Sequence, residues 1–274
     1  MMAVQKDGSG RRKVQVEVEV PGTPEEVWRA IATAEGISSW FVPTTAEYDA
    51  DGKPVRMTSN FGPDMDSTAK ITDWNPPNSF VAETHDFGDD GPTVATEWIV
   101  ESRGGGTCVV RVVHSLFAST DDWDDQMEGW ESGWPSFFRL LRLYLARFPG
   151  QTSSLVQLSG SAPLPKSSAW SALTAALGFD NPQVRHRCES SGSAPALAGV
   201  VERVGEADHP EELLLRLDTP APGIGHFFAF EMGEQVLLSV RFYLYGDTAS
   251  EVKTRDEPVW QAWMEKHLAG SVAK

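Results

Sequence analysis

A stripe of large apolar residues in the middle of the chain is the feature that most constrains its fold. The stripe recurs every three or four residues from 130 to 148, which is the spacing of one face of an α-helix. An acidic run from Asp121 to Asp125 marks the expected start of this helix, and Pro135 is expected to bend it or to mark its first turn. The stripe comprises Trp130, Trp134, Phe137, Phe138, Leu141, Leu145 and Phe148.

The residues before this helix read as a series of strands with one short helix. Apolar and polar residues alternate from Val14 to Val20, which is the period of a strand with one buried face. Thr23 and Pro24 then predict the capped start of a short helix that ends near Gly36. We expect an antiparallel meander whose concave face is covered by the long helix. Turn residues separate its further strands at about 44–50, 55–61, 67–74, 80–87, 94–101 and 107–117.

The second half of the chain repeats this order in a divergent form. Each half opens with a strand-like run that leads into a helix with a tryptophan, Trp28 in the first half and Trp170 in the second. Residues 180–198 read as loop, so the early strands of the second meander are expected to be shortened or lost. The other expected strands of this half lie within 155–161, 200–217, 225–231 and 236–245.

A final helix and a linker complete the expected organisation. Asp256 as the cap and Pro258 in the first turn predict a helix that carries Trp260 and Trp263. The segment 148–154 is rich in residues that break helices and strands, which is typical of a linker. We therefore expect two domains, at 13–148 and 154–270.

Several segments of the first half occur in an order that is typical of one family. They are the opening strand with Pro24–Ile31, then Trp40-Phe41, Trp74–Pro77, Gly106-Thr107 leading to His114-Ser115, and Gly133–Pro135. Residues 13–148 thereby resemble the START-like (SRPBCC) superfamily, in the AHSA-like branch named after activators of a heat-shock-protein ATPase. The resemblance implies an α+β helix-grip fold, START-like or Bet v-like, with a curved antiparallel sheet wrapped around a long C-terminal helix. The repeat adds a second, divergent copy in tandem.

Charge and composition exclude several classes of partner. The chain has 23 Lys and Arg against 39 Asp and Glu, and its formal charge of -16 opposes binding to nucleic acid or to an anionic membrane surface. No window approaches the roughly 18–20 apolar residues that membrane insertion requires. Cys108 and Cys188 are far apart in the sequence, which excludes a disulfide framework and fits a reducing compartment. We expect a cytoplasmic protein.

No residue pattern predicts catalysis, a metal site or a cofactor. The six histidines show no paired spacing, and the closest approach to a ligand set, His186 with Cys188, supplies only two ligands. Gly104 to Gly106 lie between two expected strands and read as a hairpin turn, unlike a phosphate-binding loop. We therefore expect no catalytic residue, no metal and no cofactor.

Inward-facing residues of the first half are expected to line a hydrophobic cavity between the sheet and the long helix. His114 shares the parity of Val110 and Val112, so its imidazole is expected to point inward. A core histidine is the favoured interpretation, and contact with the polar end of a planar or lipid-like ligand is the alternative. Trp28 and Trp134 are expected to be largely buried. The expected ligand-binding residues are Phe41, Phe61, Trp98, His114, Trp134, Phe137 and Leu141.

Three functions remain open from the sequence. The first is non-catalytic binding of a hydrophobic small molecule, which the superfamily resemblance implies. The second is a protein-interaction role like that of the chaperone-ATPase activators, and the third is an enzyme like the polyketide cyclases or dehydratases. We favour the first, because no pair of carboxylates or imidazoles predicts acid-base catalysis. The second half has fewer large aromatic residues, so its own pocket is expected to be filled.

Overall fold

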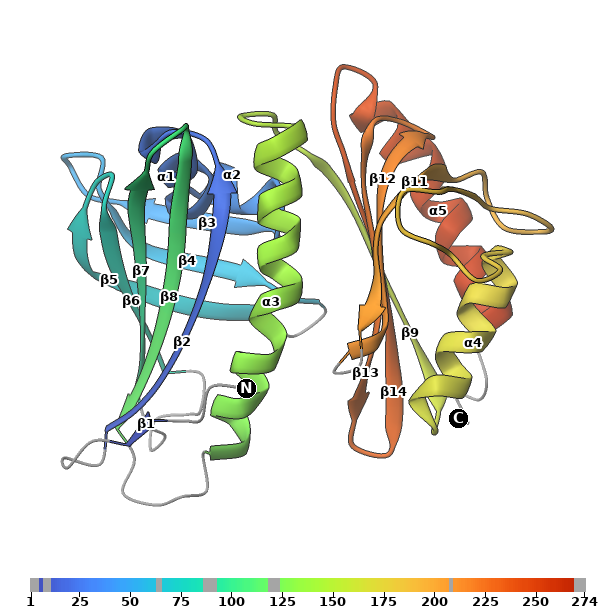
Figure 1. Cartoon of the computed structure of the whole chain (residues 1–274), viewed down its shortest axis with the longest axis horizontal. Coiled ribbons are helices and arrows are strands. Elements are labelled where there is room, and N and C mark those ends of the chain that lie inside the picture. The colour runs from blue at the N-terminus through green and yellow to red at the C-terminus, as the bar shows by residue number, and fades with distance from the viewer. Residues whose placement is uncertain are drawn as a thin grey trace. The chain divides into compact units, whose positions relative to one another are not determined.

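The computed structural model describes residues 5–6, 11–62, 66–85, 93–117, 124–206 and 209–268. The chain divides into two compact units, Met1–Thr152 and Ser153–Lys274 (Figure 1). Each unit has an antiparallel sheet and a long helix at its C-terminal end. The expected fold class, a helix-grip fold in tandem with a divergent second copy, is therefore confirmed.

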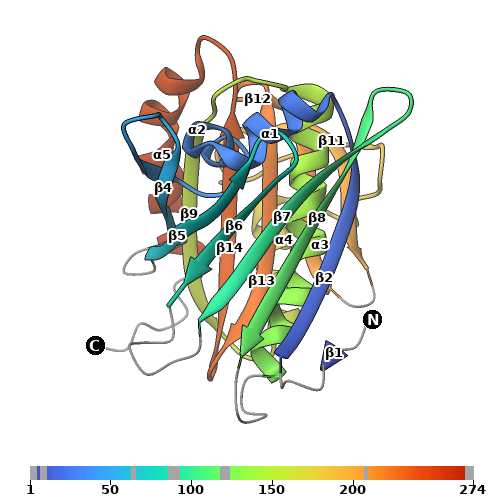
Figure 2. The same cartoon turned by 90° about the vertical axis from the view of Figure 1, so that its left-hand side faces the viewer.

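The first unit is an eight-stranded antiparallel sheet in the order β1-β2-β8-β7-β6-β5-β4-β3. Strands β3 to β8 form the expected meander, and the opening strand β2 pairs with the last strand β8. Figure 2 shows the outer face of this sheet. The strands are β1 Gln5–Lys6, β2 Arg11–Pro21, β3 Thr44–Tyr48, β4 Pro54–Asn60, β5 Asp66–Asn75, β6 Ser79–Thr84, β7 Val94–Arg103 and β8 Thr107–Phe117.

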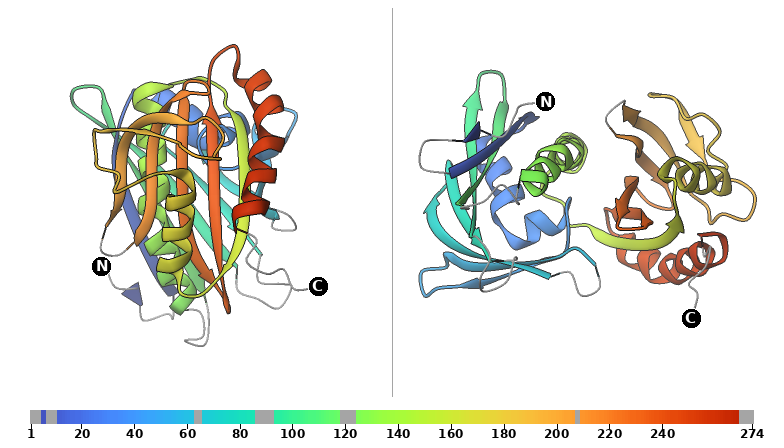
Figure 3. Two further views of the ribbon diagram at one scale, coloured as in Figure 1. Left: turned by 90° about the vertical axis from the view of Figure 1, so that its right-hand side faces the viewer. Right: turned by 90° about the horizontal axis from the view of Figure 1, so that it is seen from below.

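Three helices lie on the concave side of this sheet, α1 Pro24–Ala32, α2 Ala34–Ser38 and α3 Asp124–Arg147 (Figure 3, right). Helix α3 packs along β2 and closes the unit. It begins at Asp124, so Pro135 lies inside the helix and does not mark its first turn.

The start of α1 follows its sequence closely. Thr23 Oγ1 accepts a hydrogen bond from the Glu26 backbone N–H, and the Glu26 carboxylate accepts one from the Thr23 N–H at 2.8 Å. This reciprocal capping box satisfies two backbone donors that a helix start otherwise leaves unpaired. Trp28 then faces inward from α1 and is buried.

The end of the short helix differs from the expectation. Helix α1 ends at Ala32, and Gly36 lies inside the second short helix, α2. A Cβ atom at Gly36 would lie 1.9 Å from the carbonyl oxygen of Arg29. The glycine therefore permits a close backbone contact between the two helices.

The second unit repeats this arrangement with a shorter meander. Its six-stranded sheet has the order β10-β11-β12-β13-β14-β9, so the opening strand β9 again pairs with the last strand β14. The final helix α5 packs along β9, as α3 packs along β2. The elements are β9 Ser154–Pro163, α4 Lys166–Leu177, β10 Arg187–Glu189, β11 Ala198–Glu206, β12 His209–Thr219, β13 Gly223–Met232, β14 Gln235–Leu244 and α5 Ala249–Leu268.

Two details of the second unit bear on the sequence-based expectations. The first strand of its meander, β10, spans three residues, in keeping with the loop-like segment around it. Helix α5 begins at Ala249, about two turns before the expected start, and Pro258 lies inside it. Ala249 and Val252 are both buried in the core of this unit, so apolar packing extends the helix toward its N-terminus.

Helices α4 and α5 lie on one side of the sheet of the second unit (Figure 3, left). Apolar side chains from the sheet and from both helices form the core of this unit. The large aromatic members of this core are Phe179, Phe227, Phe242, Trp260 and Trp263.

Within the described ranges, no helix combines the length and the apolar character that crossing a membrane requires.

Candidate functional site

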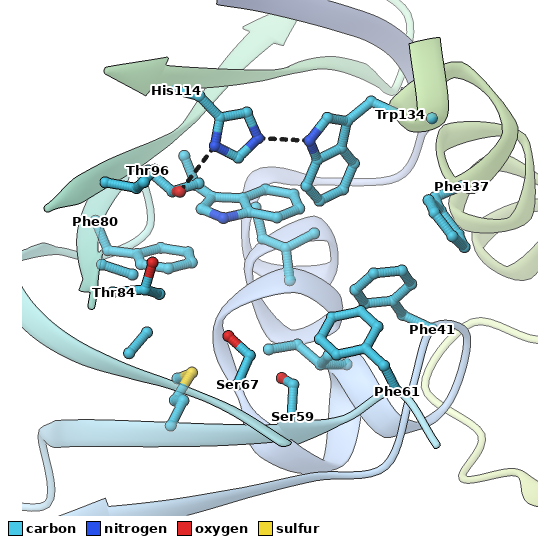
Figure 4. A pocket seen from close by; sticks show the side chains of 18 of the residues that line it. Phe41, Ser59, Phe61, Ser67, Phe80, Thr84, Thr96, His114, Trp134 and Phe137 are labelled. Carbon is cyan, nitrogen blue, oxygen red and sulfur yellow. Dashed lines mark hydrogen bonds between the residues drawn. The ribbon is translucent and has the colours of Figure 1, made fainter. Parts of the chain in front are cut away.

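A cavity of about 610 Å³ lies inside the first unit, between the concave face of the sheet and helix α3 (Figure 4). Ligand pockets for small molecules commonly have volumes of about 300–1,000 Å³. Strands β4 to β8 form its floor, while α1, α2 and the segment after α2 form one wall and α3 forms another. Most of the lining side chains are apolar, which suits a hydrophobic occupant.

The structure brings six of the seven expected ligand-binding residues together around this cavity. Leu141 is the exception, because it lies one turn further along α3 and is fully buried in the packed core. Trp134 is of intermediate burial, and its indole lines the cavity. The six residues at the cavity are Phe41, Phe61, Trp98, His114, Trp134 and Phe137.

Aromatic rings form a connected wall around the cavity. The ring of Phe41 lies between the rings of Phe61 and Phe137, with centroids 5.6 and 4.6 Å away and near-perpendicular planes. Trp98 meets Trp134 edge-on at 5.2 Å, which links the floor of the cavity to helix α3. Edge-to-face contacts of this kind are favourable beyond the area that they bury. The wall is therefore rigid and offers ring faces to a planar ligand.

His114 has both ring nitrogens in hydrogen bonds. The indole Nε1–H of Trp134 donates to His114 Nε2 at 2.5 Å, and His114 Nδ1 lies 2.9 Å from the hydroxyl of Thr96 (Figure 4). Indole is only a donor, so Nε2 must be the acceptor nitrogen and Nδ1 must carry the proton. His114 thus donates to Thr96 Oγ1, in one defined tautomer.

Burial also determines the charge of His114. The side chain is 7% exposed, and its burial lowers the pKa of His114 to about 4. The imidazole is therefore neutral at pH 7. Sequence reasoning placed this residue on the inward face, and the structure supplies the partners that make it part of the cavity wall.

Hydroxyl groups are the polar part of the lining that sequence reasoning missed. Ser59, Ser67, Thr84 and Thr96 all line the cavity from strands β4 to β7. Thr96 precedes Trp98 by two residues and therefore shares its face of the strand, which is the signal that would have found it. Ser59 Oγ already pairs with the hydroxyl of Thr44 at 3.0 Å.

Charged groups contribute little to the lining. Asp66 is the one carboxylate among the described lining residues, and it is exposed and accepts a hydrogen bond from Asn60 at 2.7 Å. No lysine or arginine is among the described residues that line the cavity. A ligand with a negative charge would therefore find no counter-ion there.

The described part of the chain offers little to a metal ion or to nucleophilic catalysis outside the cavity. It contains no cluster of three or more His, Cys, Asp or Glu side chains that could hold a metal ion. Cys108 and Cys188 are buried, and burial raises the pKa of both thiols. A raised pKa reduces the thiolate fraction, which is the reactive form.

Comparison with known proteins places the first unit in a family. Residues 21–146 match the family model described as "Activator of Hsp90 ATPase homolog 1-like protein". No curated protein matches the chain significantly.

The chain is also structurally similar to several solved proteins. They include the di-domain ARO/CYC BexL from the BE-7585A biosynthetic pathway, at 15% identity and a TM-score of 0.44, with 95% of this chain and 99% of that chain covered. The Aha1 dimer from Colwellia psychrerythraea has 18% identity and a TM-score of 0.38, covering 48% of this chain and 95% of that chain. Similarity at this level assigns neither a reaction nor a ligand.

The family match spans α1, α2, strands β3 to β8 and all but the last residue of α3, which are the elements that form the cavity. It includes the segments that carry the sequence resemblance, except for the opening strand. Over residues 21–146 the first unit therefore matches this family, which confirms its resemblance to the AHSA-like branch of the START-like (SRPBCC) superfamily.

Proposed function

We propose that the first unit binds a hydrophobic small molecule in the cavity between its sheet and α3, and that it does so without catalysing a reaction. The observation that carries this proposal is the cavity itself, about 610 Å³ in volume and walled by aromatic rings. An apolar molecule that leaves water for such a site gains roughly 25 cal/mol for each Å² of its buried surface.

The state of His114 argues against acid-base catalysis at this site. A general base needs a lone pair within hydrogen-bond reach of the substrate proton. The Nε2 lone pair of His114 accepts from Trp134, and its Nδ1–H donates to Thr96. Asp66, the other titratable lining group described, is exposed and bonded to Asn60. A cyclase-like reaction would need one of these groups aimed at the substrate.

Gly133 offers a direct test of the cavity. This glycine lines the cavity from α3, and a Cβ atom added there would have no atom within 4 Å among the described residues other than its chain neighbours and the nearby helix backbone. A larger side chain can therefore occupy part of the cavity without displacing the protein core. Replacing a helical glycine by alanine also favours the helix by about 1 kcal/mol.

The experiment titrates N-phenyl-1-naphthylamine, an uncharged fluorescent probe, into the wild-type chain, Gly133→Leu and the matched control Gly133→Ala. We expect the wild type and Gly133→Ala to bind alike. Gly133→Leu should bind at least about tenfold more weakly, because its isobutyl group fills space that the probe needs. Equal binding by all three proteins, with unchanged unfolding midpoints, would contradict this site.

A further inference from the structure

Three residues at one end of the cavity form a directed chain of hydrogen bonds. The chain runs from the Trp134 indole to the His114 imidazole and on to the Thr96 hydroxyl, over 2.5 and 2.9 Å (Figure 4). Its direction follows from its first member, because an indole N–H can only donate. His114 accepts from Trp134 on one side and donates to Thr96 on the other.

The last member of the chain, Thr96, still has its hydroxyl proton to donate. A threonine hydroxyl has one proton and two acceptor lone pairs, and one lone pair is used by His114 Nδ1–H. Within the described residues, no group accepts the Thr96 hydroxyl proton. Thr96 lines the cavity, so the acceptor that this proton lacks can be supplied by the occupant.

The upstream bonds strengthen this donor. A hydroxyl that accepts a hydrogen bond becomes more polarised, and such chains are cooperative in a low-dielectric interior. The other end of the chain is anchored by the packing of Trp134 against Trp98 at 5.2 Å. The Thr96 hydroxyl is therefore a preorganised donor inside an apolar cavity.

We infer that the Thr96 hydroxyl selects the ligand of this cavity, and that the ligand is an uncharged aromatic or alicyclic molecule with a carbonyl or ether oxygen as its acceptor. This inference rests on the proposed binding function and adds the chemistry of recognition. It also replaces the expected contact with His114, whose ring nitrogens are both occupied by Trp134 and Thr96.

The same argument disfavours a carboxylate at this position. A carboxylate could accept from Thr96, but it would lose its hydration without gaining a cation. No lysine or arginine is found among the described lining residues, and His114 is neutral at pH 7. A neutral acceptor loses much less hydration free energy on burial and can make the same hydrogen bond.

The other hydroxyls are weaker candidates for this role. Ser59 already pairs with Thr44, and Ser67 has a further interaction of its own. Thr84 lines the same cavity from β6, but it is not part of the chain from Trp134. Thr84 therefore supplies a matched control, since the same substitution there removes a cavity hydroxyl and leaves the chain intact.

The test compares two probes of nearly the same shape, 2-acetylnaphthalene and 2-isopropenylnaphthalene, which differ in a carbonyl oxygen against a methylene carbon. For wild-type protein we expect the ketone to bind about three- to tenfold more tightly, the usual value of one neutral hydrogen bond. In Thr96→Val this preference should disappear. Thr96→Ser should restore it, and Thr84→Val should retain it. The anion 2-naphthoate should bind at least about tenfold more weakly than the ketone.

An infrared measurement separates recognition from a structural role. The carbonyl stretch of bound 2-acetylnaphthalene should lie at lower frequency in the wild type than in Thr96→Val, because a hydrogen bond weakens the C=O bond. The ratio of the affinities for the two probes is measured within each variant. Partial unfolding of Thr96→Val would weaken the binding of both probes alike and would leave this ratio unchanged.

The outcomes distinguish the two proposals. If neither naphthalene probe binds the wild type, both the binding function and this inference fail. If both bind but without a preference, or if Thr96→Val keeps the preference and the carbonyl frequency, only the role of Thr96 is wrong. A loss of preference in Thr84→Val with Thr96→Val unchanged would assign the donor to Thr84.

Discussion

The indole Nε1–H of Trp134 on α3 donates to Nε2 of His114 on β8, so the long helix and the sheet are joined by a hydrogen bond at the cavity wall. Because the donor is an indole, this one contact determines which nitrogen of His114 carries the proton. It also occupies the lone pair with which His114 could otherwise act as a general base. The bond therefore makes His114 a relay between Trp134 and Thr96.

The neutral state of His114 predicts a dependence of stability on pH. Burial lowers the pKa of His114 to about 4, whereas the unfolded chain has the ordinary value near 6.5. Between these values the unfolded state binds the proton and the native state does not, so the free energy of unfolding falls as the pH falls from 6.5 to 4. Protonation of His114 lowers the free energy of unfolding by about 3 kcal/mol in full. This decrease is small above about pH 6.5, where the unfolded chain does not bind the proton either.

Chemical denaturation at pH 7, 5.5 and 4.5 measures this effect against His114→Gln, which keeps hydrogen-bonding groups but does not titrate. The difference in free energy of unfolding between the two proteins should shrink as the pH falls. A difference that stays constant over this range would mean that His114 is protonated in the native state or that its pKa is not lowered.

The tautomer of His114 is itself measurable. A long-range proton–nitrogen correlation spectrum at pH 7 should show the neutral form with the proton on Nδ1. In Trp134→Phe the donor to Nε2 is absent, so we expect a mixture of the two neutral tautomers and a loss of about 1 kcal/mol in stability. An unchanged histidine spectrum in Trp134→Phe would contradict the direction of the chain.

Gly36 is predicted to be intolerant of any side chain. A Cβ atom there would lie 1.9 Å from the Arg29 carbonyl oxygen, so Gly36→Ala must separate α1 from α2. We expect a loss of about 1–3 kcal/mol in the free energy of unfolding, typical of overpacking. The ketone probe should also bind more weakly, because α2 positions Phe41 at the cavity.

Gly104 provides the matched control for this substitution. It lies in the turn between β7 and β8, where a Cβ atom would meet nothing within 4 Å. Gly104→Ala should change the stability by no more than about 0.5 kcal/mol. Equal stabilities for the two alanine variants, measured by urea unfolding, would refute the close contact at Gly36.

Residue periodicity predicts the sheet, its concave face and six of the 20 described residues that line the cavity. Parity along β7 and β8 places Trp98 and His114 inward, and the helical stripe places Trp134 and Phe137 on the same face of α3. Leu141 has the same periodicity but lies where the helix packs directly on the core. Periodicity gives the face of an element, and only tertiary packing decides where that face is covered.

The hydrogen bonds of the cavity could not be predicted in this way. Whether Trp134 reaches His114 depends on the rotation of α3 about its axis, which is set by contacts along the whole helix. Thr96 is not hydrophobic, so a pattern of apolar residues does not identify it as an inward-facing residue. The early start of α5 has a similar cause, because burial of Ala249 and Val252 outweighs the start signal at Pro258.

The second unit is predicted to contribute packing without a ligand. Trp260 on α5 is 1% exposed and its ring lies 4.9 Å from that of Phe242 and 5.5 Å from that of Trp263. Trp260→Ala should destabilise this unit by about 3–5 kcal/mol, the usual cost of deleting a large buried aromatic side chain. Trp170→Ala, at a partly buried position on α4, should cost clearly less.

The measurement combines urea unfolding, followed by far-ultraviolet circular dichroism, with titration of 2-acetylnaphthalene under native conditions. Because every described residue that lines the cavity belongs to the first unit, Trp260→Ala should keep the wild-type affinity wherever the chain remains folded. The cavity left by Trp260 is expected to lower the unfolding midpoint of the second unit in proportion to the packing lost. A midpoint equal to that of the wild type would show that Trp260 is not packed as described, and a loss of ketone binding would place a ligand contact in the second unit.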